Sequence, residues 1–377
     1  MCRMNSVRLL MVADTLAGGG AERVILDLVN ASLKRNDVEI VVAVSQKTGT
    51  LKDAFPRSTR IYEYGAFRAA HNVLNNASRL SEICKAEDID AIVSHMTTVN
   101  KSVLRAKIVA PSLPDVYIVE HTEIARQLFD IPSAWKRFTR PIEFRLLYPR
   151  AKKIVTVSRD IGIELQKYCD INPKIFATIL NPVDRLRGQN QSVDVVRAGP
   201  KGKSLISVGR LDGVKNFKTL ITAFAKVVAA RGHFDDRLTI LGEGYQRDTL
   251  VSLARELGVF EQISLPGFTD DIYPHLKVSD IFISTSRYEG LGNAMLEAIS
   301  AGVPCIATST AGSEELKRHL KSISIVKQDD VMSLVNVILR ELDDPKLVVT
   351  DEDQNFIDTL NPDHVLQRYI DLIIGAK

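Results

Sequence analysis

Two carboxylates with seven residues between them, Glu289 and Glu297, have the spacing that most strongly suggests chemistry. Glu289 follows the apolar run 281–285, which is typical of a buried parallel strand, and Glu297 lies in the stretch 293–301, which predicts a helix. Backbone N–H groups at the start of such a helix can bind ligand oxygens. They belong to Gly290, Leu291, Gly292 and Asn293. Although a single glutamate is more often a solvated surface charge, this combination favours a polyhydroxylated anionic ligand such as a sugar nucleotide.

Two cations stand in a similar position earlier in the chain. Arg210 and Lys215 lie between a predicted strand at 204–208 and a helix predicted over about 217–230. Arginine donates through a planar fork and lysine carries a compact charge, and both suit a diphosphate near a helix N-terminus. Either residue alone would more often be a surface charge. Together they predict a diphosphate-binding loop.

The N-terminal half offers a glycine-rich loop. Gly18 and Gly19 lie between a predicted strand at 7–13 and a helix that begins near Ala21. Such glycines let the backbone approach a ligand closely. The G-x-G-x-x-G spacing of dinucleotide-binding proteins is absent, however, and no acidic residue ends the second predicted strand, 38–44. A ligand contact and a plain flexible loop both remain open.

A histidine follows another strand of the same half. His121 comes just after the predicted strand 116–119. An isolated histidine is more often a structural hydrogen-bonding residue than a catalytic one. Because ligands of open α/β sheets bind beyond the carboxyl ends of the strands, we expect His121 to face a cleft between two domains.

Length and composition set the class of protein. At 377 residues the chain is too long for one ordinary core, so two α/β domains are expected. A net charge of +3 gives no strong field that would favour nucleic acid. The four cysteines show neither a Cys-x-x-Cys pair nor disulfide spacing, which predicts a reduced cytosolic protein without structural zinc. With no apolar run near the roughly 18 residues of a membrane span, we expect the protein to work inside the cell.

Two Asp-x-Asp pairs raise the question of a metal. They are Asp88 with Asp90 and Asp351 with Asp353. Neither pair follows the carboxyl end of a predicted strand, where a metal would meet a diphosphate. We therefore interpret both as ordinary turns and expect no metal site.

The order of the elements predicts two Rossmann-like, doubly wound parallel-sheet domains that face each other across a cleft. The first domain is expected at 1–184 and a polar, glycine-containing linker at 185–203. The second domain is expected at 204–355, followed by a terminal segment at 356–377 whose pattern predicts an amphipathic helix.

The glutamate stretch resembles the family-4 retaining glycosyltransferases of the GT-B fold. Their signature is Glu, seven residues, Glu, then a small residue, Gly, any residue and Pro, and here Ala301–Pro304 completes it. Gly-Arg-Leu at 209–211 with Lys215 is similar to the family's diphosphate-binding pair. Gly-Gly-Ala-Glu-Arg at 19–23 looks like the opening of surface-polysaccharide glycosyltransferases.

The resemblance implies that the terminal helix at 356–377 crosses back to the first domain. It also implies a role for each candidate residue. Arg210 and Lys215 would stabilise the leaving diphosphate of a nucleoside diphosphate sugar, without a metal or other cofactor. Glu289 and the amides of 290–293 would hold hydroxyls of the donor sugar, and Glu297 would hold the ribose. His121 would contact the sugar near its 6-position, and the loop at Gly18 and Gly19 would lie against the diphosphate. A UDP-sugar is favoured over a GDP-sugar, and the acceptor would be a saccharide or lipid-diphosphate-linked saccharide of a bacterial glycan pathway.

Departures and rivals remain. Gly312 and Glu315 match the second Gly and the Glu of a family Gly-Gly-x-x-Glu turn, but Ala311 replaces its first Gly. A non-catalytic or epimerase-like sugar-nucleotide-binding protein of the same fold is the alternative. A dehydrogenase is third, weakened by the missing dinucleotide fingerprint.

A basic and aromatic stretch at 135–153 suggests peripheral contact with an anionic membrane at the inner face of the cell membrane. A core-facing helix with a solvated basic side explains the same pattern. Pro141 and Pro149 are expected to limit any continuous helix here.

Overall fold

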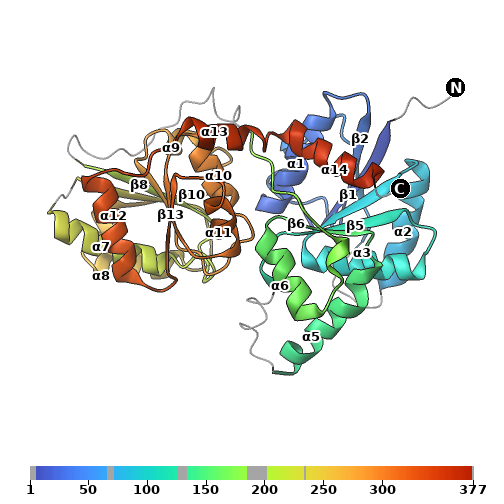
Figure 1. The fold of residues 1–377 in the computed structure, drawn as a ribbon, viewed down its shortest axis with the longest axis horizontal. Coiled ribbons are helices and arrows are strands. Elements are labelled where there is room, and N and C mark those ends of the chain that lie inside the picture. The colour runs from blue at the N-terminus through green and yellow to red at the C-terminus, as the bar shows by residue number, and fades with distance from the viewer. Residues whose placement is uncertain (1–5, 66–71, 125–133, 185–201, 233–234, 376–377) are drawn as a thin grey trace. The chain divides into compact units, whose positions relative to one another are not determined.

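The computed structural model describes residues 6–65, 72–124, 134–184, 202–232 and 235–375. The chain divides into two compact units, coloured from blue to red along the chain in Figure 1. The first unit comprises Met1–Pro182 and Leu360–Lys377, and the second comprises Val183–Thr359. Most of the expected linker, 185–201, lies outside the described residues.

The first unit is built on a seven-stranded parallel sheet with the order β3-β2-β1-β4-β5-β6-β7. The strands are β1 (Val7–Ala13), β2 (Val38–Val44), β3 (Ile61–Glu63), β4 (Ala91–His95), β5 (Asp115–Glu120), β6 (Lys153–Thr156) and β7 (Phe176–Thr178). Its central strands are runs of β-branched and other apolar residues that are buried throughout, as a parallel sheet covered on both faces requires. The strand order reverses between β1 and β4, which makes this the switch point of the sheet.

Helices connect these strands, and the last helix of the chain returns to this unit. They are α1 (Gly20–Ser32), η1 (Lys52–Ala54), α2 (Val73–Ala86), α3 (Thr97–Val109), α5 (Ala134–Leu147), η3 (Tyr148–Arg150), α6 (Arg159–Cys169), η4 (Pro173–Ile175) and α14 (Pro362–Ile374). Helix α14 packs beside α1, and Arg35 donates a hydrogen bond of 2.5 Å to Gln367 (Figure 1).

One expectation about α5 is wrong. This helix passes through Pro141 rather than ending there, whereas Pro149 lies in the short 3₁₀ helix that follows. A proline costs a helix one hydrogen bond, and the burial of Phe144 and Leu147 on the inner side of α5 offsets that loss.

The second unit contains a six-stranded parallel sheet with the order β10-β9-β8-β11-β12-β13, so its switch point lies between β8 and β11. The strands are β8 (Ser204–Val208), β9 (Arg237–Leu241), β10 (Ile263–Gly267), β11 (Ile281–Ser284), β12 (Cys305–Thr308) and β13 (Ile323–Val326). The helices are α7 (Phe217–Arg231), α8 (Arg247–Glu256), η5 (Phe260–Gln262), α9 (Tyr273–Leu276), α10 (Asn293–Ser300), α11 (Ala311–Lys317), α12 (Val331–Asp343) and α13 (Asp351–Asp358). Both units thus have the doubly wound parallel sheets that the sequence predicts.

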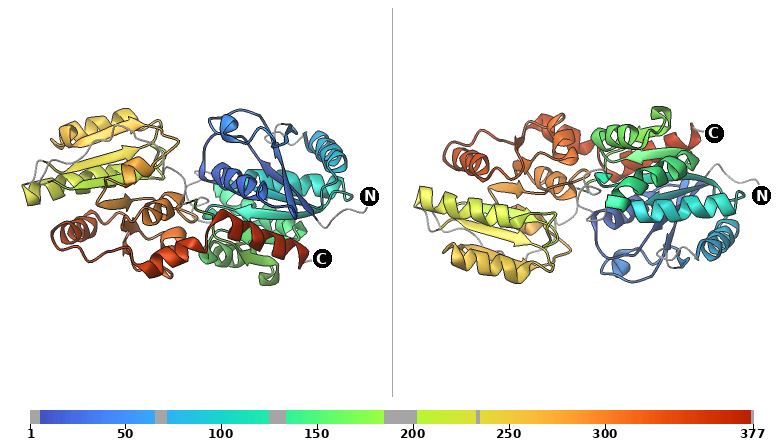
Figure 2. Two further views of the ribbon diagram at one scale, coloured as in Figure 1. Left: turned by 90° about the horizontal axis from the view of Figure 1, so that it is seen from above. Right: turned by 90° about the horizontal axis from the view of Figure 1, so that it is seen from below.

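Two groups of helices cover the second sheet. Helices α7 and α12 pack together over one face, where Phe217, Phe224 and Ile338 share a buried cluster with Ile281 and Ile283 of β11. Successive residues of a strand point to opposite faces of the sheet, so the buried side chain of Phe282 packs on the face opposite to Ile281 and Ile283. There α10 packs against α9 and α13 (Figures 1 and 2). Strands β8 and β11 are therefore held firmly in the middle of the unit, with the loops after them at one edge.

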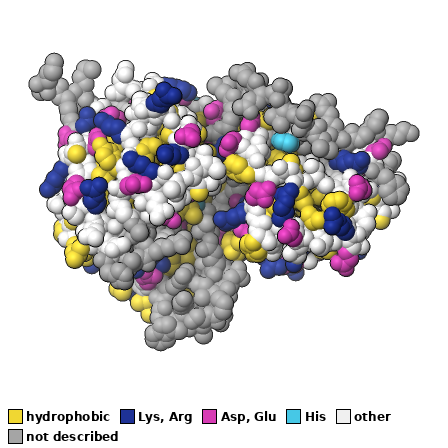
Figure 3. Space-filling model, turned by 180° about the vertical axis from the view of Figure 1, so that it is seen from behind, with side chains coloured by type: hydrophobic (Ala, Val, Ile, Leu, Met, Phe, Trp, Pro, Cys, Tyr) yellow, Lys and Arg dark blue, Asp and Glu magenta, His cyan; other side chains and the backbone are white. Residues whose placement is uncertain are grey.

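The described surface carries both signs of charge. Lys and Arg side chains are interspersed with Asp and Glu side chains over the face that Figure 3 shows, in keeping with the net charge of +3. Within the described part of the chain, every helix is too short or too polar to cross a lipid bilayer.

Candidate functional site

The loop after β8 folds back so that the side chain of Lys215 lies against Gly209, at the start of the loop. The carboxylate of Asp212 accepts backbone N–H groups from Val214 at 3.0 Å and Lys215 at 3.2 Å, which tightens the loop into a turn. The aliphatic part of the Lys215 side chain then passes over Gly209. A Cβ atom at residue 209 would lie only 2.8 Å from Cε of Lys215, so the glycine is required for this path.

The ammonium group of Lys215 meets the carboxylate of Glu289 at the switch point of the sheet. Nζ of Lys215 lies 2.5 Å from Oε2 of Glu289, and the hydroxyl of Ser286 donates to the same oxygen at 3.0 Å. The two charged side chains are 23% and 20% exposed, so solvent and a ligand can both reach them. The predicted diphosphate loop and the first glutamate of the signature are thus brought into direct contact.

The loop that carries Glu289 is fastened on two sides. On one side the hydroxyl of Thr285 donates to the carbonyl of Lys215 at 2.9 Å, and the N–H of Arg287 donates to that of Val214 at 2.8 Å. On the other side the N–H of Gly312, at the start of α11, donates to the carbonyl of Glu289 at 2.8 Å. These bonds keep the carboxylate in place before any ligand arrives.

Helix α10 begins immediately beyond this loop. Gly292 has φ of 81°, a left-handed conformation that favours glycine, and it turns the chain from the loop into the helix at Asn293. Asn293 and Glu297 are four residues apart on one side of α10, and both are half-buried. The loop of Gly290 and Leu291 is buried at the base of this turn. The second glutamate thus lies one turn along the helix from Asn293.

Arg210 differs from Lys215. Its guanidinium pairs with Asp212 at 2.7 Å, and the side chain is 77% exposed. It therefore belongs to the same loop but points to solvent in this state. Asp212 also holds the backbone of the loop, so it is a residue that shapes the site. The sequence interpretation missed it, and its position two residues after Arg210 is the only sequence signal that could have indicated it.

The candidate residues of the first unit lie at the carboxyl ends of its central strands. Gly18, with φ of 88°, and Gly19 lead from β1 into α1. His121 follows β5 and its Nε2 lies 3.0 Å from Nδ1 of His95, the last residue of β4. The two rings are stacked with centroids 5.3 Å apart. His95 was not among the predicted site residues, although a histidine at the end of the strand next to His121 is a signal that could have identified it.

Burial controls the ionisation of this region. It lowers the pKa of His121 to about 4 and the pKa of His95 well below its ordinary value, so both rings are neutral at pH 7. Burial also raises the pKa of the Glu120 carboxyl. Hydrogen bonds donated by Tyr148, Asn100 and Thr97 to this carboxyl act in the opposite direction and reduce the rise. Glu120 is fully buried, so we assign it to the support of β5 rather than to ligand contact.

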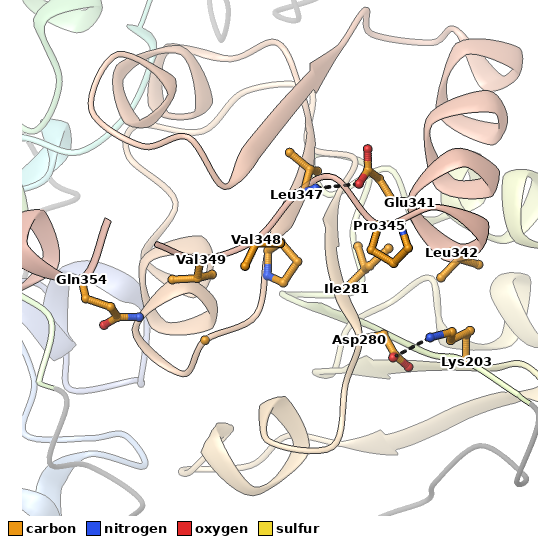
Figure 4. A pocket seen from close by; sticks show the side chains of 12 residues that line it. Lys203, Asp280, Ile281, Glu341, Leu342, Pro345, Leu347, Val348, Val349 and Gln354 are labelled. Carbon is orange, nitrogen blue, oxygen red and sulfur yellow. Dashed lines mark hydrogen bonds and ion pairs between the residues drawn. The ribbon is translucent and has the colours of Figure 1, made fainter. Parts of the chain in front are cut away.

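A cavity of the second unit lies at the amino end of its sheet rather than at the carboxyl end. This cavity of about 260 Å³ lies where β8, β11 and β12 begin, between the Lys203–Asp280 ion pair and the segment that follows α12 (Figure 4). Ligands of open α/β sheets bind beyond the carboxyl ends of the strands. We therefore assign the site to the opposite edge, where Lys215 and Glu289 meet.

One aspartate of each Asp-x-Asp pair accepts a hydrogen bond that supports the fold. Asp90 accepts the N–H of Arg8 at 2.9 Å, and Asp353 forms a capping box with Thr350 at the start of α13. Among the described residues there is no group of three or more acidic, histidine or cysteine side chains that could hold a metal ion.

Two doubly wound parallel sheets, with a cation and a carboxylate paired at the switch point of one of them, define an α/β class of protein whose ligands bind beyond the carboxyl ends of the strands. A model of the family "Glycosyl transferases group 1" matches residues 189–358, and a model of "Glycosyltransferase Family 4" matches residues 18–187. The chain belongs to this family of GT-B glycosyltransferases.

Relatives with known names share parts of the chain. N-acetylgalactosamine-N,N'-diacetylbacillosaminyl-diphospho-undecaprenol 4-alpha-N-acetylgalactosaminyltransferase of Campylobacter jejuni is 31% identical over 54% of each chain. UDP-Gal:alpha-D-GlcNAc-diphosphoundecaprenol alpha-1,3-galactosyltransferase of Escherichia coli is 27% identical over 45% of each chain. The chain therefore spans about half the length of these relatives.

A solved structure is similar to this chain over nearly its full length. The Anabaena HepE protein in complex with UDP-glucose superimposes with a TM-score of 0.76 over 98% of this chain and 99% of its own, at 16% identity. At that identity the similarity establishes the fold alone, and it confirms the predicted GT-B fold class.

Proposed function

We propose that the protein is a retaining glycosyltransferase that transfers a sugar from a nucleoside diphosphate sugar, with UDP favoured over GDP. The observation that carries this proposal is the contact between Lys215 and Glu289 at the switch point of the second sheet. A cation for a phosphate and a carboxylate for sugar hydroxyls lie side by side, as a sugar bonded to a diphosphate requires. The UDP-glucose bound by the HepE protein and the UDP-Gal in the name of the E. coli relative support the choice of donor.

The residues divide the work of the reaction as follows. Lys215 stabilises the negative charge that grows on the leaving diphosphate, and Arg210 turns from Asp212 and solvent towards the same group. Glu289 and the amides of 290–293 hold hydroxyls of the donor sugar. Glu297, further along α10, holds the ribose, while the ring of His121 and the loop of Gly18 and Gly19 provide contacts from the first unit.

The chemistry that fits these groups needs no protein nucleophile. The acceptor hydroxyl attacks the anomeric carbon from the face that the diphosphate leaves, and an oxygen of the donor phosphate takes the proton of that hydroxyl. The anomeric configuration is thereby retained. With cations of the chain stabilising the diphosphate, a metal ion is not required.

The acceptor we propose is a saccharide or lipid-diphosphate-linked saccharide in the assembly of a bacterial surface glycan. Both named relatives carry a diphospho-undecaprenol acceptor in their names, which supports this choice. Such a lipid-linked acceptor would place the enzyme at the inner face of the cell membrane.

Turnover of a panel of UDP-, GDP- and ADP-sugars tests the proposal. We expect at least one UDP-sugar to raise the melting temperature, since a ligand at 100 times its Kd stabilises by about 2.7 kcal/mol. Slow hydrolysis of that donor should continue in excess EDTA, and NMR should show that the sugar first released keeps the anomeric configuration of the donor. Binding without turnover would instead support the non-catalytic alternative. Activity that EDTA abolishes and Mn²⁺ restores would contradict the role of Lys215 and Arg210.

Helix α5 supplies the test for membrane contact. Ile142 and Leu146 lie one turn apart on this helix and are 46% and 67% exposed, next to the exposed Arg145. Leu146→Gln should weaken sedimentation with anionic vesicles by about tenfold, because a buried leucine side chain contributes about 1.5–3 kcal/mol. Leu74→Gln, which changes a 69% exposed leucine of α2, is the matched control. Equal binding to neutral and anionic vesicles would contradict the proposed electrostatic contact.

A further inference from the structure

The contact between His95 and His121 restricts how protons can be placed on the two rings. Nδ1 of His95 and Nε2 of His121 are 3.0 Å apart, so one nitrogen donates a hydrogen and the other accepts it. The ring of His95 is fully buried, and its other nitrogen, Nε2, has no hydrogen-bond partner. His121 as a whole residue is half-buried, so a ligand can reach it.

Only one arrangement avoids a buried, unpaired N–H group. If Nε2 of His121 donated, His95 would have to carry its own hydrogen on the buried Nε2. An unpaired N–H away from water is a costly and rare group. If Nδ1 of His95 donates instead, its Nε2 carries only a lone pair. His121 then accepts at Nε2 and carries its hydrogen on Nδ1.

The backbone next to the pair is also unusual. Met96 follows His95 with φ of 77°, in the left-handed region that a methionine seldom adopts. Its N–H donates to the carbonyl of Val119 at 3.1 Å, which ties the end of β4 to the end of β5. Strained residues persist where surrounding contacts hold them, and they gather at functional sites. Here the strained residue holds the two histidine-bearing strand ends together.

We propose that His95 is a positioning residue that fixes His121 in its neutral Nδ1–H tautomer, so that His121 offers its substrate one hydrogen-bond donor. The role of that donor towards a sugar hydroxyl rests on the proposed function, whereas the tautomer itself does not.

The same geometry keeps the pair neutral. An added proton on Nε2 of His121 would require His95 to move its own hydrogen to the buried Nε2. Two ionisable groups near the pair have other partners. Glu120 is bonded to Thr97, Asn100 and Tyr148, and the ammonium of Lys101 is bonded to Glu143. Glu123 is a buried acidic residue two positions beyond His121. The lowered pKa values of both histidines agree with this restriction.

Long-range ¹H–¹⁵N correlation NMR of the full chain, labelled with ¹⁵N-histidine, tests the tautomer without any substrate. The chain has seven histidines, and single substitutions assign the two signals. We expect both His95 and His121 to carry hydrogen on Nδ1, and neither to titrate near pH 6.5, where an ordinary histidine does. Hydrogen on Nε2 of His121, or its titration near that pH, would overturn the proposal.

Two substitutions of His95 distinguish its role as a hydrogen-bond donor to His121 from a role in packing alone. His95→Asn keeps an N–H donor close to Nδ1 and should preserve the tautomer of His121. His95→Phe keeps a planar ring without the donor, so His121 should move its hydrogen to Nε2 and its pKa should rise. Identical spectra of His121 in both variants would overturn the proposal. If His95→Phe does not fold, the wild-type and His95→Asn spectra still decide.

Kinetics add a separate test. His95→Phe should lower kcat by ~10-fold, the loss of about one hydrogen bond, with His95→Asn close to wild type. Equal losses in the two variants would contradict the positioning role. Absence of turnover in the wild type would refute only the proposed function. It would not affect the assignment of the His121 tautomer, because the NMR measurement does not depend on turnover.

Discussion

Glu289→Gln is expected to lower kcat by about 10²-fold, which corresponds to about 2.7 kcal/mol of transition-state stabilisation. The substitution keeps the shape of the side chain and removes a negative charge beside a sugar carbon that gains positive character. It also removes the partner of Lys215, whose ammonium lies 2.5 Å from the Glu289 carboxylate. Since that ammonium then has no competing carboxylate, the affinity for a bare nucleoside diphosphate should be unchanged or higher. Initial rates with the full donor and calorimetry with the bare nucleotide measure the two quantities.

Glu297→Gln should give the opposite pattern. Its proposed partners are ribose hydroxyls, which are present whether or not the sugar is attached, so the bare nucleotide should bind more weakly. Glu256→Gln is the control, because Glu256 is an exposed glutamate at the end of α8 in the same unit. Loss of the bare nucleotide in Glu289→Gln together with normal binding in Glu297→Gln would show that the roles of the two glutamates are reversed.

Lys215→Ala is expected to weaken binding of a nucleoside diphosphate by about 1.5–3 kcal/mol, the range for a hydrogen bond to a charged group. The loss has two parts. The diphosphate loses a cation, and the Glu289 carboxylate, now without its ion pair, repels the phosphate charge. Calorimetry with UDP against wild type measures the sum, and an unchanged affinity would contradict the assignment of the diphosphate to this loop.

A double substitution separates those two parts. Lys215→Ala combined with Glu289→Gln removes the repulsion as well as the cation, so UDP should bind more tightly than to Lys215→Ala alone. An affinity of the double variant no higher than that of Lys215→Ala would contradict the proposed repulsion between the Glu289 carboxylate and the phosphate. Lys218→Ala, which changes an exposed lysine in the first turn of α7, is the matched control for loss of positive charge.

Much of the fold could be predicted from local sequence. The strand expected at 204–208 is β8, and that expected at 38–44 is β2. Uninterrupted Val, Ile and Leu runs are buried on both faces of a parallel sheet, so the run itself determines the strand. Strand β6 ends at Thr156 although Val157 continues its apolar pattern, because Val157 and Ser158 lead into the N-terminus of α6.

The positions of the candidate residues along the chain were also readable from sequence. Glycines between a strand and a helix mark backbone that must approach a neighbour, and Gly209 and Gly292 meet that requirement in the structure. A residue directly after a parallel strand must lie at the ligand-binding edge of the sheet. Those two rules pointed to the loops that carry Lys215, Glu289 and His121, without any knowledge of the partners of these residues.

Their partners were decided only by the tertiary structure. Lys215 and Glu289 are 74 residues apart and meet because β8 and β11 are neighbours across the switch point, an order that no local pattern specifies. His95 and His121 meet because β4 and β5 are paired in a register that opposes His95 to Val119. The exposure of Arg210 likewise depends on Asp212 being directed towards it. Residue types determine which groups can ionise or donate, but strand order and register determine which of them come within bonding distance.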